Sequence, residues 1–456
     1  MPIYVNRTLN FKKIKAIGFD MDYTIVRYYT ENFERLAYNI VLKKLVEKKD
    51  YPKEIFDLKF DFKMAVPGLV IDKREGNVLK LSRFGKVKAC YHGTKPMDFK
   101  KQQSIYSGRV IDLADPHIKS LDTSFSIAHG VLFMQISQLK IDGLRLPSFD
   151  HITEDLKKCL DEAHCDGSIK DCVRANVSEF IVQDPKVAEL MERLKRHGKQ
   201  VLIITNSDYA YTKLLLDYAI NPFLKEHKDW KEVFEVTITK SMKPKFFIGR
   251  EEFLKIDPDT GLMSNHNGKI EKGGIYQGGN AAALQEDFDF EGEDVLYLGD
   301  HIYGDVVSLK KKLNWRTALV VEQIEEEMKG LVATYSIQQK IDKLMGEKEN
   351  LEKKLTDLYD RRMDKGEKIQ KSESDKIYTE IEKIDEKIAK EIPNFQSHFN
   401  PYWGELMRAG NEESLFMGQV EKYACIYMGR ITDLLDYSPR TYFRPPKRIM
   451  PHEIRE

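Results

Sequence analysis

The stretch KIKAIGFDMDYTIVR, residues 13–27, joins a short apolar run to two carboxylates. Ala16 to Phe19 are apolar, Asp20 ends the run, and Asp22 follows two residues later. A continuous apolar run of this length is typical of a strand that is buried on both faces of a parallel sheet. Side chains alternate along an extended chain, so the spacing of two residues lets both acids face the same pocket. The stretch therefore predicts a buried strand that ends at a polar site.

Two further apolar runs end in the same way. VLIIT ends at Thr205, and VLYLG is followed by Asp300. The segment DPKVAELMERLKRHGKQVLIIT, residues 184–205, indicates a helix, a closing glycine and a strand. We therefore predict an α/β fold with a doubly wound parallel sheet. Ligands of such sheets bind outside the carboxyl ends of the strands, so Asp20, Thr205 and Asp300 are expected to meet in one site.

The amino-acid composition indicates a protein with a hydrophobic core and gives no sign of a nucleic-acid or membrane binder. The chain has 456 residues, which suggests more than one domain, and its 41% hydrophobic content is enough for a core. Lys+Arg and Asp+Glu are equal at 73 each, which gives no sign of a general nucleic-acid or membrane binder. The five cysteines have no CxxC or zinc-site spacing, which fits reduced thiols. With no apolar leader or run of about 18 apolar residues, we expect a cytoplasmic protein.

The order of the motifs predicts three parts. Residues 1–40 and 165–335 are expected to form the catalytic core, with residues 395–456 returning to pack on it. Residues 41–164 are too many for a simple crossover, so we expect an inserted cap domain that covers the site and selects the substrate. Residues 336–392 carry Leu and Ile at spacings of three, four and seven, which predicts an antiparallel helical hairpin.

The hairpin has a simple interpretation. Its polar faces are heavily charged, and most such elements serve packing or assembly rather than chemistry. We therefore expect it to pack or to contribute to a homo-oligomer, either a dimer or a tetramer.

The acids at the strand ends suit phosphoryl transfer. Asp20 can attack phosphorus and form an aspartyl-phosphate. Asp22 can protonate the leaving oxygen and later activate water. Clustered carboxylates repel a phosphate unless a cation intervenes, and Asp300 and Asp305 in GDHIYGD are hard oxygen ligands suited to Mg²⁺. We expect this ion to bind at Asp20, Asp300 and Asp305.

Two further residues can bind the phosphate. The hydroxyl of Thr205 and nearby backbone N–H groups can donate to its oxygens. Lys243, in SMKPKFF, can balance negative charge on Asp20 and on the phosphoryl group. Pro244 biases Lys243 toward an extended backbone, which helps to hold it in place.

The motifs DMDYT, TNS, KP and GDHIYGD, in this order, resemble the four motifs of the haloacid-dehalogenase (HAD) superfamily of phosphotransferases. Further segments, among them HCDGSIK, ITNSDYAYT and YFRPPKRIMPHE, resemble the cytosolic purine 5'-nucleotidases, which are HAD enzymes that hydrolyse inosine and guanosine monophosphate. The similarity runs in patches along nearly the whole chain. It implies a HAD-like core with an inserted cap, Mg²⁺ as cofactor and a purine nucleoside monophosphate as substrate.

The resemblance also assigns roles to individual residues. It implies that Asp20 is the nucleophile, Asp22 the general acid/base, Thr205 the phosphate-binding hydroxyl and Lys243 the lysine of the third motif. Asn206 and Ser207 lie beside Thr205, and Asp22 would also bind Mg²⁺ through its backbone carbonyl. The substrate contacts that the resemblance implies are Phe125 against the purine, Lys157, Asp161 and His164 toward the sugar and base, and Lys170 at the phosphate. Lys157 stands where the family has an arginine, and lysine lacks the planar fork that binds a carbonyl group bidentately.

Three alternatives remain open from the sequence. The aspartyl-phosphate can be intercepted by a second nucleoside, which would make the protein a nucleoside phosphotransferase. The HAD motifs also fit a phosphatase for another small phosphorylated metabolite. A non-catalytic scaffold that binds a partner through the hairpin is the third, and the presence of both Asp20 and Asp22 argues against it.

Overall fold

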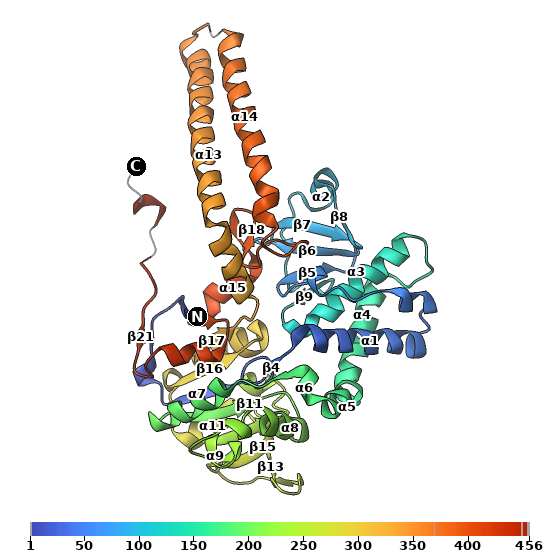
Figure 1. Cartoon of the computed structure of the whole chain (residues 1–456), viewed down its shortest axis with the longest axis vertical. Helices are drawn as coiled ribbons and strands as arrows, with labels where there is room; N and C mark the ends of the chain where they lie inside the picture. The colour runs from blue at the N-terminus through green and yellow to red at the C-terminus, as the bar shows by residue number, and fades with distance from the viewer. Residues whose placement is uncertain (1, 369, 448–449, 454–456) are drawn as a thin grey trace. The chain divides into compact units, whose positions relative to one another are not determined.

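The computed structural model describes residues 2–368, 370–447 and 450–453. The chain forms two compact units (Figure 1). The first comprises Met1–Glu322 and Leu406–Glu456, and the second comprises Gln323–Glu405. The first unit contains a ten-stranded sheet, a five-stranded sheet and the helices around them, and the second unit is a helical hairpin.

The ten-stranded sheet has the order β1-β20-β17-β16-β3-β11-β12-β15-β13-β14. Its seven strands from β20 to β15 are parallel, and β1, β13 and β14 are antiparallel at the edges. The bounds are β1 Tyr4–Val5, β20 Ile426–Met428, β17 Arg316–Val320, β16 Val295–Gly299, β3 Ala16–Phe19, β11 Gln200–Ile204, β12 Val236–Thr239, β15 Gly274–Gly278, β13 Phe253–Ile256 and β14 Met263–Asn265. The predicted doubly wound α/β core is confirmed.

Strand β3 lies at the point where the order of the sheet reverses. The chain passes from β3 to β11, β12 and β15 on one side, and then returns to β16, β17 and β20 on the other. Phe19 of β3 pairs with Ile203 and with Leu298, and all three side chains are buried. Ligands of open α/β sheets bind at such a switch point. The residue that follows Phe19 is Asp20, so the strand order itself places Asp20 where a ligand would bind.

The helices of this core follow the expected pattern. In α7 (Pro185–Arg196), Asp184 caps the first turn by accepting from Lys186 N, and the apolar face is buried. The chain then turns at Gly198, whose φ of 73° is the left-handed region that glycine favours. The other helices around the sheet are α8 (Tyr209–Ala219), α9 (Trp230–Val233), α10 (Lys245–Ile248), α11 (Ala281–Phe288), α12 (Ser308–Leu313) and α15 (Leu415–Tyr423).

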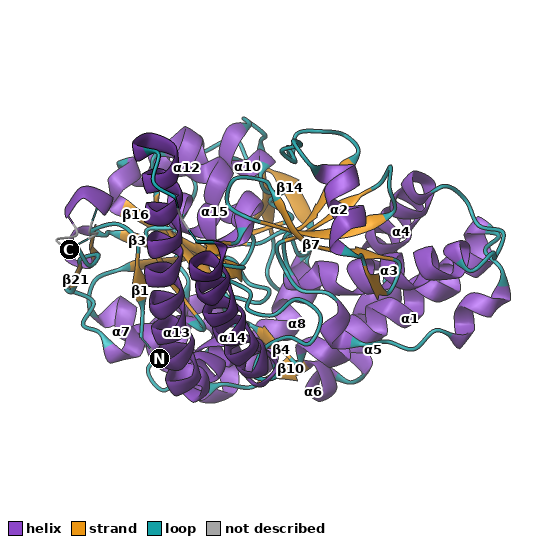
Figure 2. Cartoon of the chain, turned by 90° about the horizontal axis from the view of Figure 1, so that it is seen from above, coloured by secondary structure: helices purple, strands orange, loops and turns teal. Residues whose placement is uncertain are grey.

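The segment between β4 (Arg27–Tyr28) and β10 (Ile181–Val182) holds the second sheet (Figure 2). This sheet is antiparallel in the order β8-β7-β6-β5-β9, with bounds Lys95–Pro96, Val87–His92, Asn77–Leu81, Leu69–Asp72 and Ile118–Leu121. Its helices are α1 (Thr30–Lys49), α2 (Phe99–Tyr106), α3 (Ile127–Ile141), α4 (Phe149–Cys165), α5 (Ser168–Ala175) and α6 (Val177–Phe180). Short paired strands complete this unit: β2 (Leu9–Asn10) with β21 (Tyr442–Phe443), β4 with β10, and β18 (Arg408–Ala409) with β19 (Glu412–Glu413).

The second unit consists of α13 (Ile324–Lys365) and α14 (Lys371–Gln396). Helix α13 ends at Gly366, which has a φ of 66°. Leu344, Leu358 and Ile384 are buried, and Lys348 of α13 forms a 2.7 Å ion pair with Asp385 of α14. The expected hairpin of residues 336–392 lies within this unit. Among the described residues, no helix is both long enough and apolar enough to cross a membrane.

Gly18 allows a close contact between two central strands. It pairs with Tyr297 of β16, and a Cβ atom on Gly18 would lie 2.8 Å from Tyr297 Cδ2. We predict that Gly18→Ala lowers the free energy of unfolding by about 1–3 kcal/mol, because the buried Tyr297 ring must shift. Urea unfolding measures the effect.

Gly346 in α13 provides the matched control, because a Cβ atom there meets nothing within 4 Å. Gly346→Ala is expected to stabilise the hairpin by about 0.5–1 kcal/mol, since alanine has the higher helix propensity. A Gly18→Ala variant as stable as the wild type would show that the β3–β16 contact is not tight.

Candidate active site

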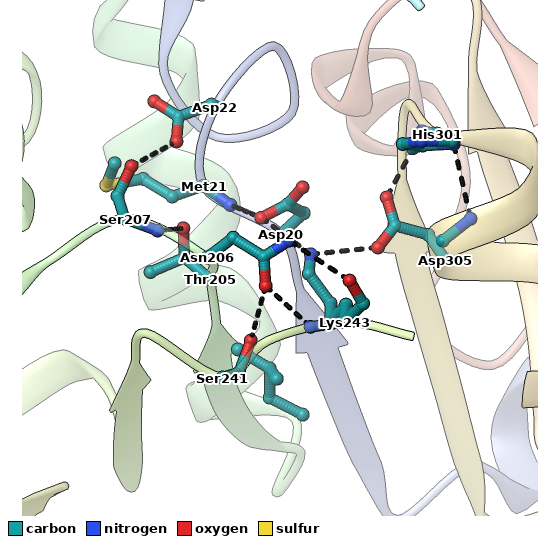
Figure 3. A network of polar contacts seen from close by, with 12 residues as sticks. Asp20, Met21, Asp22, Thr205, Asn206, Ser207, Ser241, Lys243, His301 and Asp305 are labelled. Atoms are coloured by element: carbon teal, nitrogen blue, oxygen red, sulfur yellow. Dashed lines mark hydrogen bonds and ion pairs between the residues drawn. The ribbon is translucent and has the colours of Figure 1, made fainter. Parts of the chain in front are cut away.

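Asp20 lies directly after β3 and is buried (Figure 3). Its backbone N–H donates to Leu298 O at 2.8 Å, which continues the pairing with β16. Its carboxylate Oδ1 accepts from Met21 N at 2.7 Å and lies 2.9 Å from Lys243 Nζ. Burial raises the pKa of Asp20 to about 6, although the ammonium group of Lys243 opposes this shift. The carboxylate is thus fixed at the switch point of the sheet.

Lys243 is the cation of the site. Its Nζ lies 2.9 Å from Asp20 Oδ1, 2.8 Å from Asp305 Oδ1 and 3.0 Å from Tyr297 Oη, and its side chain is only 3% exposed. Burial opposes the charged form, but Asp20 and Asp305 raise the pKa of Lys243 well above its ordinary value. On the backbone, Lys243 N donates to Asn206 Oδ1 at 2.7 Å. The loop after β12 is therefore fastened to the loop after β11.

Three carboxylates gather beside this lysine. Oxygen atoms of Asp20, Asp300 and Asp305 all lie within 4.8 Å of one another. Asp305 belongs to the π-helical segment Ile302–Val307, and its Oδ2 accepts from His301 N at 3.1 Å. Burial raises the pKa of Asp300 well above its ordinary value, and the charges of Asp20 and Asp305 add to this shift.

The acidic group fits a divalent cation. Among the described side chains, Asp300 Oδ2 is a buried oxygen that has no hydrogen-bond partner. An unpaired buried carboxylate oxygen is costly, and Mg²⁺ takes oxygen ligands of this kind. The donor set of Asp20, Asp300 and Asp305 therefore suits Mg²⁺ on chemical grounds.

Asp22 is held on both carboxylate oxygens. Tyr28 Oη donates to Oδ1 at 2.6 Å, and Ser207 Oγ donates to Oδ2 at 2.7 Å (Figure 3 shows the second contact). Burial, and then the charge of Asp20, raise the pKa of Asp22 to about 6, although the two hydrogen bonds lower it. A carboxyl group with a pKa in this range can both give and take a proton near neutral pH.

The loop after β11 lies beside Asp22. Thr205 is fully buried, and its Oγ1 accepts from Ser207 N at 3.1 Å. Asn206 is exposed, and its Oδ1 also accepts from Ser241 Oγ at 3.1 Å. The structure therefore brings together the predicted residues Asp20, Asp22, Thr205, Asn206, Ser207, Lys243, Asp300 and Asp305.

An aromatic group lies next to Asp22. It comprises Tyr23, Tyr28, Phe33, Phe125 and His164. The Phe125 ring centroid is 4.6 Å from Tyr23, 5.5 Å from Phe33 and 5.8 Å from His164, each in an edge-on arrangement. Tyr23 and Tyr28 stack at 4.8 Å. The predicted residues Phe125 and His164 thus lie together, and they pack against the loop that follows Asp20.

Lys170 lies on α5 and reaches toward the loop after β11. Its Nζ forms a 2.5 Å ion pair with Asp208 and lies 5.3 Å from the centroid of the Tyr211 ring. Burial, and then the charge of Lys170, lower the pKa of His164 to about 4, so the imidazole is neutral at pH 7. Lys170 is therefore positioned near both the aromatic group and Asp22.

Lys157 and Asp161 are not brought into this arrangement. Both residues are exposed on α4. Among the described residues, neither makes a side-chain hydrogen bond or an ion pair. The roles expected for them toward the sugar and base stay predictions.

Sequence reasoning missed four residues that support the site, namely Tyr28, Asp208, Tyr211 and Tyr297. Tyr297 Oη donates to Ile204 O at 2.9 Å and accepts from Lys243. One signal could have found Tyr297, because a tyrosine inside a fully buried strand needs a partner for its hydroxyl group. Tyr28 is six residues from Asp22, a spacing that carries no sign of a contact. The contacts of Asp208 with Lys170 and of Tyr211 with Tyr28 join segments that are distant in sequence.

Comparison with known proteins identifies the family. The model of the "5' nucleotidase family" matches residues 3–455. A 5'-nucleotidase domain-containing protein of Dictyostelium discoideum is 25% identical over 99% of this chain and 75% of its own length. 5'-Nucleotidase domain-containing protein 2 of Rattus norvegicus is also 25% identical, over 99% of this chain and 80% of its own length.

A similar solved structure is a haloacid dehalogenase-like family hydrolase from Xanthomonas campestris. It is 9% identical, covers 67% of this chain and 82% of that one, and has a TM-score of 0.25, which is too low to add to the argument from topology. The family match covers almost the whole chain, and the strand order and the acidic site agree with it. The chain therefore belongs to the 5' nucleotidase family, which makes it a phosphoric monoester hydrolase.

Proposed function

We propose that this protein is a Mg²⁺-dependent 5'-nucleotidase that hydrolyses purine nucleoside monophosphates, IMP and GMP, through an aspartyl-phosphate. The observation that carries the proposal is the pairing at the end of β3. Asp20 lies 2.9 Å from the buried ammonium of Lys243, and Asp22 is held on both oxygens by Tyr28 and Ser207. A nucleophile beside a cation, with a second acid two residues away, is what phosphoryl transfer through a carboxylate requires.

In the first step, a carboxylate oxygen of Asp20 forms a bond to phosphorus while the bond from phosphorus to the 5'-oxygen breaks. Asp22 gives its proton to that oxygen, and the nucleoside leaves. Thr205, Ser207 and Lys243 supply the hydroxyl groups and the positive charge that hold the phosphoryl oxygens. Lys243 is held in place by Asp20 and Asp305 before substrate arrives, so its charge needs little reorganisation in the transition state.

In the second step, Asp22 takes a proton from water, and the water oxygen attacks phosphorus. The bond between phosphorus and Asp20 breaks, which regenerates the carboxylate and releases inorganic phosphate. Asp22 is then protonated for the next cycle. A nucleoside hydroxyl in place of water would give the nucleoside phosphotransferase reaction.

Mg²⁺ would be held by side chains of Asp20, Asp300 and Asp305 and by the backbone carbonyl of Asp22. When bound, it supplies positive charge that offsets the repulsion between a phosphate and the clustered carboxylates.

The aromatic group supports a base-bearing substrate. We propose that residues 41–164 act as the substrate-selecting cap, with Phe125 against the purine and His164 toward the nucleoside. Lys170 would meet the phosphate, and Lys157 and Asp161 would reach the sugar and base from the exposed face of α4. Because Lys157 lacks the guanidinium fork, the selection of 6-oxopurines would rest more on stacking than on bidentate hydrogen bonding.

The proposed function predicts which substrates are hydrolysed and whether hydrolysis needs the metal. With Mg²⁺, phosphate release is expected from IMP and GMP and to a lesser extent from AMP, CMP, UMP and glucose 6-phosphate. EDTA is expected to stop release, and Asp20→Asn is expected to abolish it, because an amide cannot form the aspartyl-phosphate. A colorimetric phosphate assay over this panel measures the outcome.

Asp57→Asn is the matched control, because Asp57 is exposed and belongs to none of the four motifs. Faster release from glucose 6-phosphate than from IMP would favour a phosphatase for another metabolite. A well-folded protein that releases phosphate from no substrate would favour a scaffold that acts through the hairpin.

The proposed function also predicts how strongly Phe125 contributes to the binding of a purine. Phe125→Ala is expected to raise KM for IMP by about 10-fold, because base stacking on an aromatic ring contributes about 1–3 kcal/mol. KM for p-nitrophenyl phosphate, which carries no purine, is expected to stay within about 2-fold. Phe56→Ala, at a residue that is 49% exposed, is the control. Equal changes in KM for the two substrates would mean that Phe125 only packs.

A further inference from the structure

We propose that Tyr28 is a positioning residue for Asp22, and that it holds Oδ1 so that Oδ2 is the oxygen that serves the leaving group. This inference rests on the proposed function, because it takes Asp22 as the general acid/base. Tyr28 belongs to none of the four motifs and was not among the residues predicted from the sequence.

The two oxygens of Asp22 have partners of different kinds. Oδ1 accepts from Tyr28 Oη at 2.6 Å, and Oδ2 accepts from Ser207 Oγ at 2.7 Å. Hydrogen bonds to a carboxylate are among the stronger ones in proteins, and together these two fix the plane of the group. Tyr28 lies in the buried aromatic group, whereas Ser207 lies on the loop after β11, so the two oxygens differ in whether a substrate can take their partner away.

A second tyrosine determines the direction of these bonds. Tyr28 Oη also lies 3.3 Å from Tyr211 Oη. A phenol has one proton, and that of Tyr28 is directed to Asp22, so Tyr211 is the donor in the second contact. Tyr211 is buried on α8, where its N–H donates to Asp208. The chain of hydroxyl groups therefore runs from Tyr211 through Tyr28 to Oδ1 of Asp22.

Tyr28 itself is rigidly placed. It is 3% exposed and lies in β4, where it pairs with Ile181 of β10. Its ring stacks on Tyr23 at 4.8 Å and meets Phe33 edge-on at 4.9 Å. Because the backbone is paired and the ring is packed against Tyr23 and Phe33, the hydroxyl group has little freedom to leave Oδ1.

Ser207 is not held in the same way, because it lies on the loop that would bind phosphate. A substrate phosphate competes with Asp22 for the Ser207 hydroxyl, but it does not compete for the buried hydroxyl of Tyr28. When Ser207 turns to the phosphate, Oδ2 loses its partner and Oδ1 keeps its own. Substrate binding thus frees the one oxygen of Asp22 that then delivers the proton.

Tyr28→Phe tests this assignment, because it keeps the packed ring and removes only the hydroxyl group. We expect kcat to fall by about 10-fold for IMP and for p-nitrophenyl phosphate alike, with KM changed by less than about 2-fold, since the loss affects the orientation of Asp22 and not binding. Tyr211→Phe is expected to give a smaller loss of kcat. Tyr29→Phe, at a residue that is 48% exposed, removes a neighbouring hydroxyl group and should have no effect.

Unchanged kcat in a folded Tyr28→Phe variant would overturn the inference, as would a rise in KM for IMP alone, which would make Tyr28 a substrate contact. Hydrolysis of p-nitrophenyl phosphate distinguishes failure of this inference from failure of the proposed function. That substrate carries no purine, so its kcat reports on Asp22 even if the purine assignment is wrong. If the wild type hydrolyses neither substrate, crystal structures of the wild type and of Tyr28→Phe test the positioning role instead. A rotated Asp22 carboxylate in Tyr28→Phe supports the positioning role, and an unmoved one overturns it.

Discussion

The buried ammonium group of Lys243 is the contact on which the site depends. It touches Asp20, which follows β3, Tyr297 within β16, and Asp305 in the helical segment after β16. Three acids could not share so small a space without a cation, and a buried lysine could not stay charged without partners. Removing one partner from such a group leaves an uncompensated charge. The charge balance around Lys243 therefore holds the site together and also places the acids that would carry out the reaction.

The sequence predicted most of this arrangement for a physical reason. Asp20, Thr205 and Asp300 each follow an apolar run, and in a parallel sheet the ends of such runs must meet. The predicted doubly wound fold and the meeting of these residues in the structure both follow from that rule. Lys243 belongs to no such run and was placed by resemblance to the HAD motifs.

The other contacts of the site could not be predicted from local sequence patterns. Tyr28 and Tyr211 are far apart in sequence, and only the pairing of β4 with β10 and the packing of α8 bring their hydroxyl groups together. Lys157 and Asp161 were expected at the site, but both are exposed on α4. The position of a residue along a helix does not say which face of that helix meets a ligand. Strand-end chemistry can be predicted from one sequence, whereas contacts made by side chains across a core depend on tertiary packing.

The position of β3 between β11 and β16 has a consequence for how the protein matures. β3 is made before β16, but the N–H of Asp20, which follows β3, donates to Leu298 O of that later strand. Contacts of such sequence separation form slowly, because a long loop must close first. During synthesis, Asp20 therefore lacks its neighbours Asp300 and Asp305 until the ribosome has passed Asp305. A nascent chain that carries only Asp20 and Asp22 has no complete active site, so catalytic competence cannot precede the synthesis of Asp305.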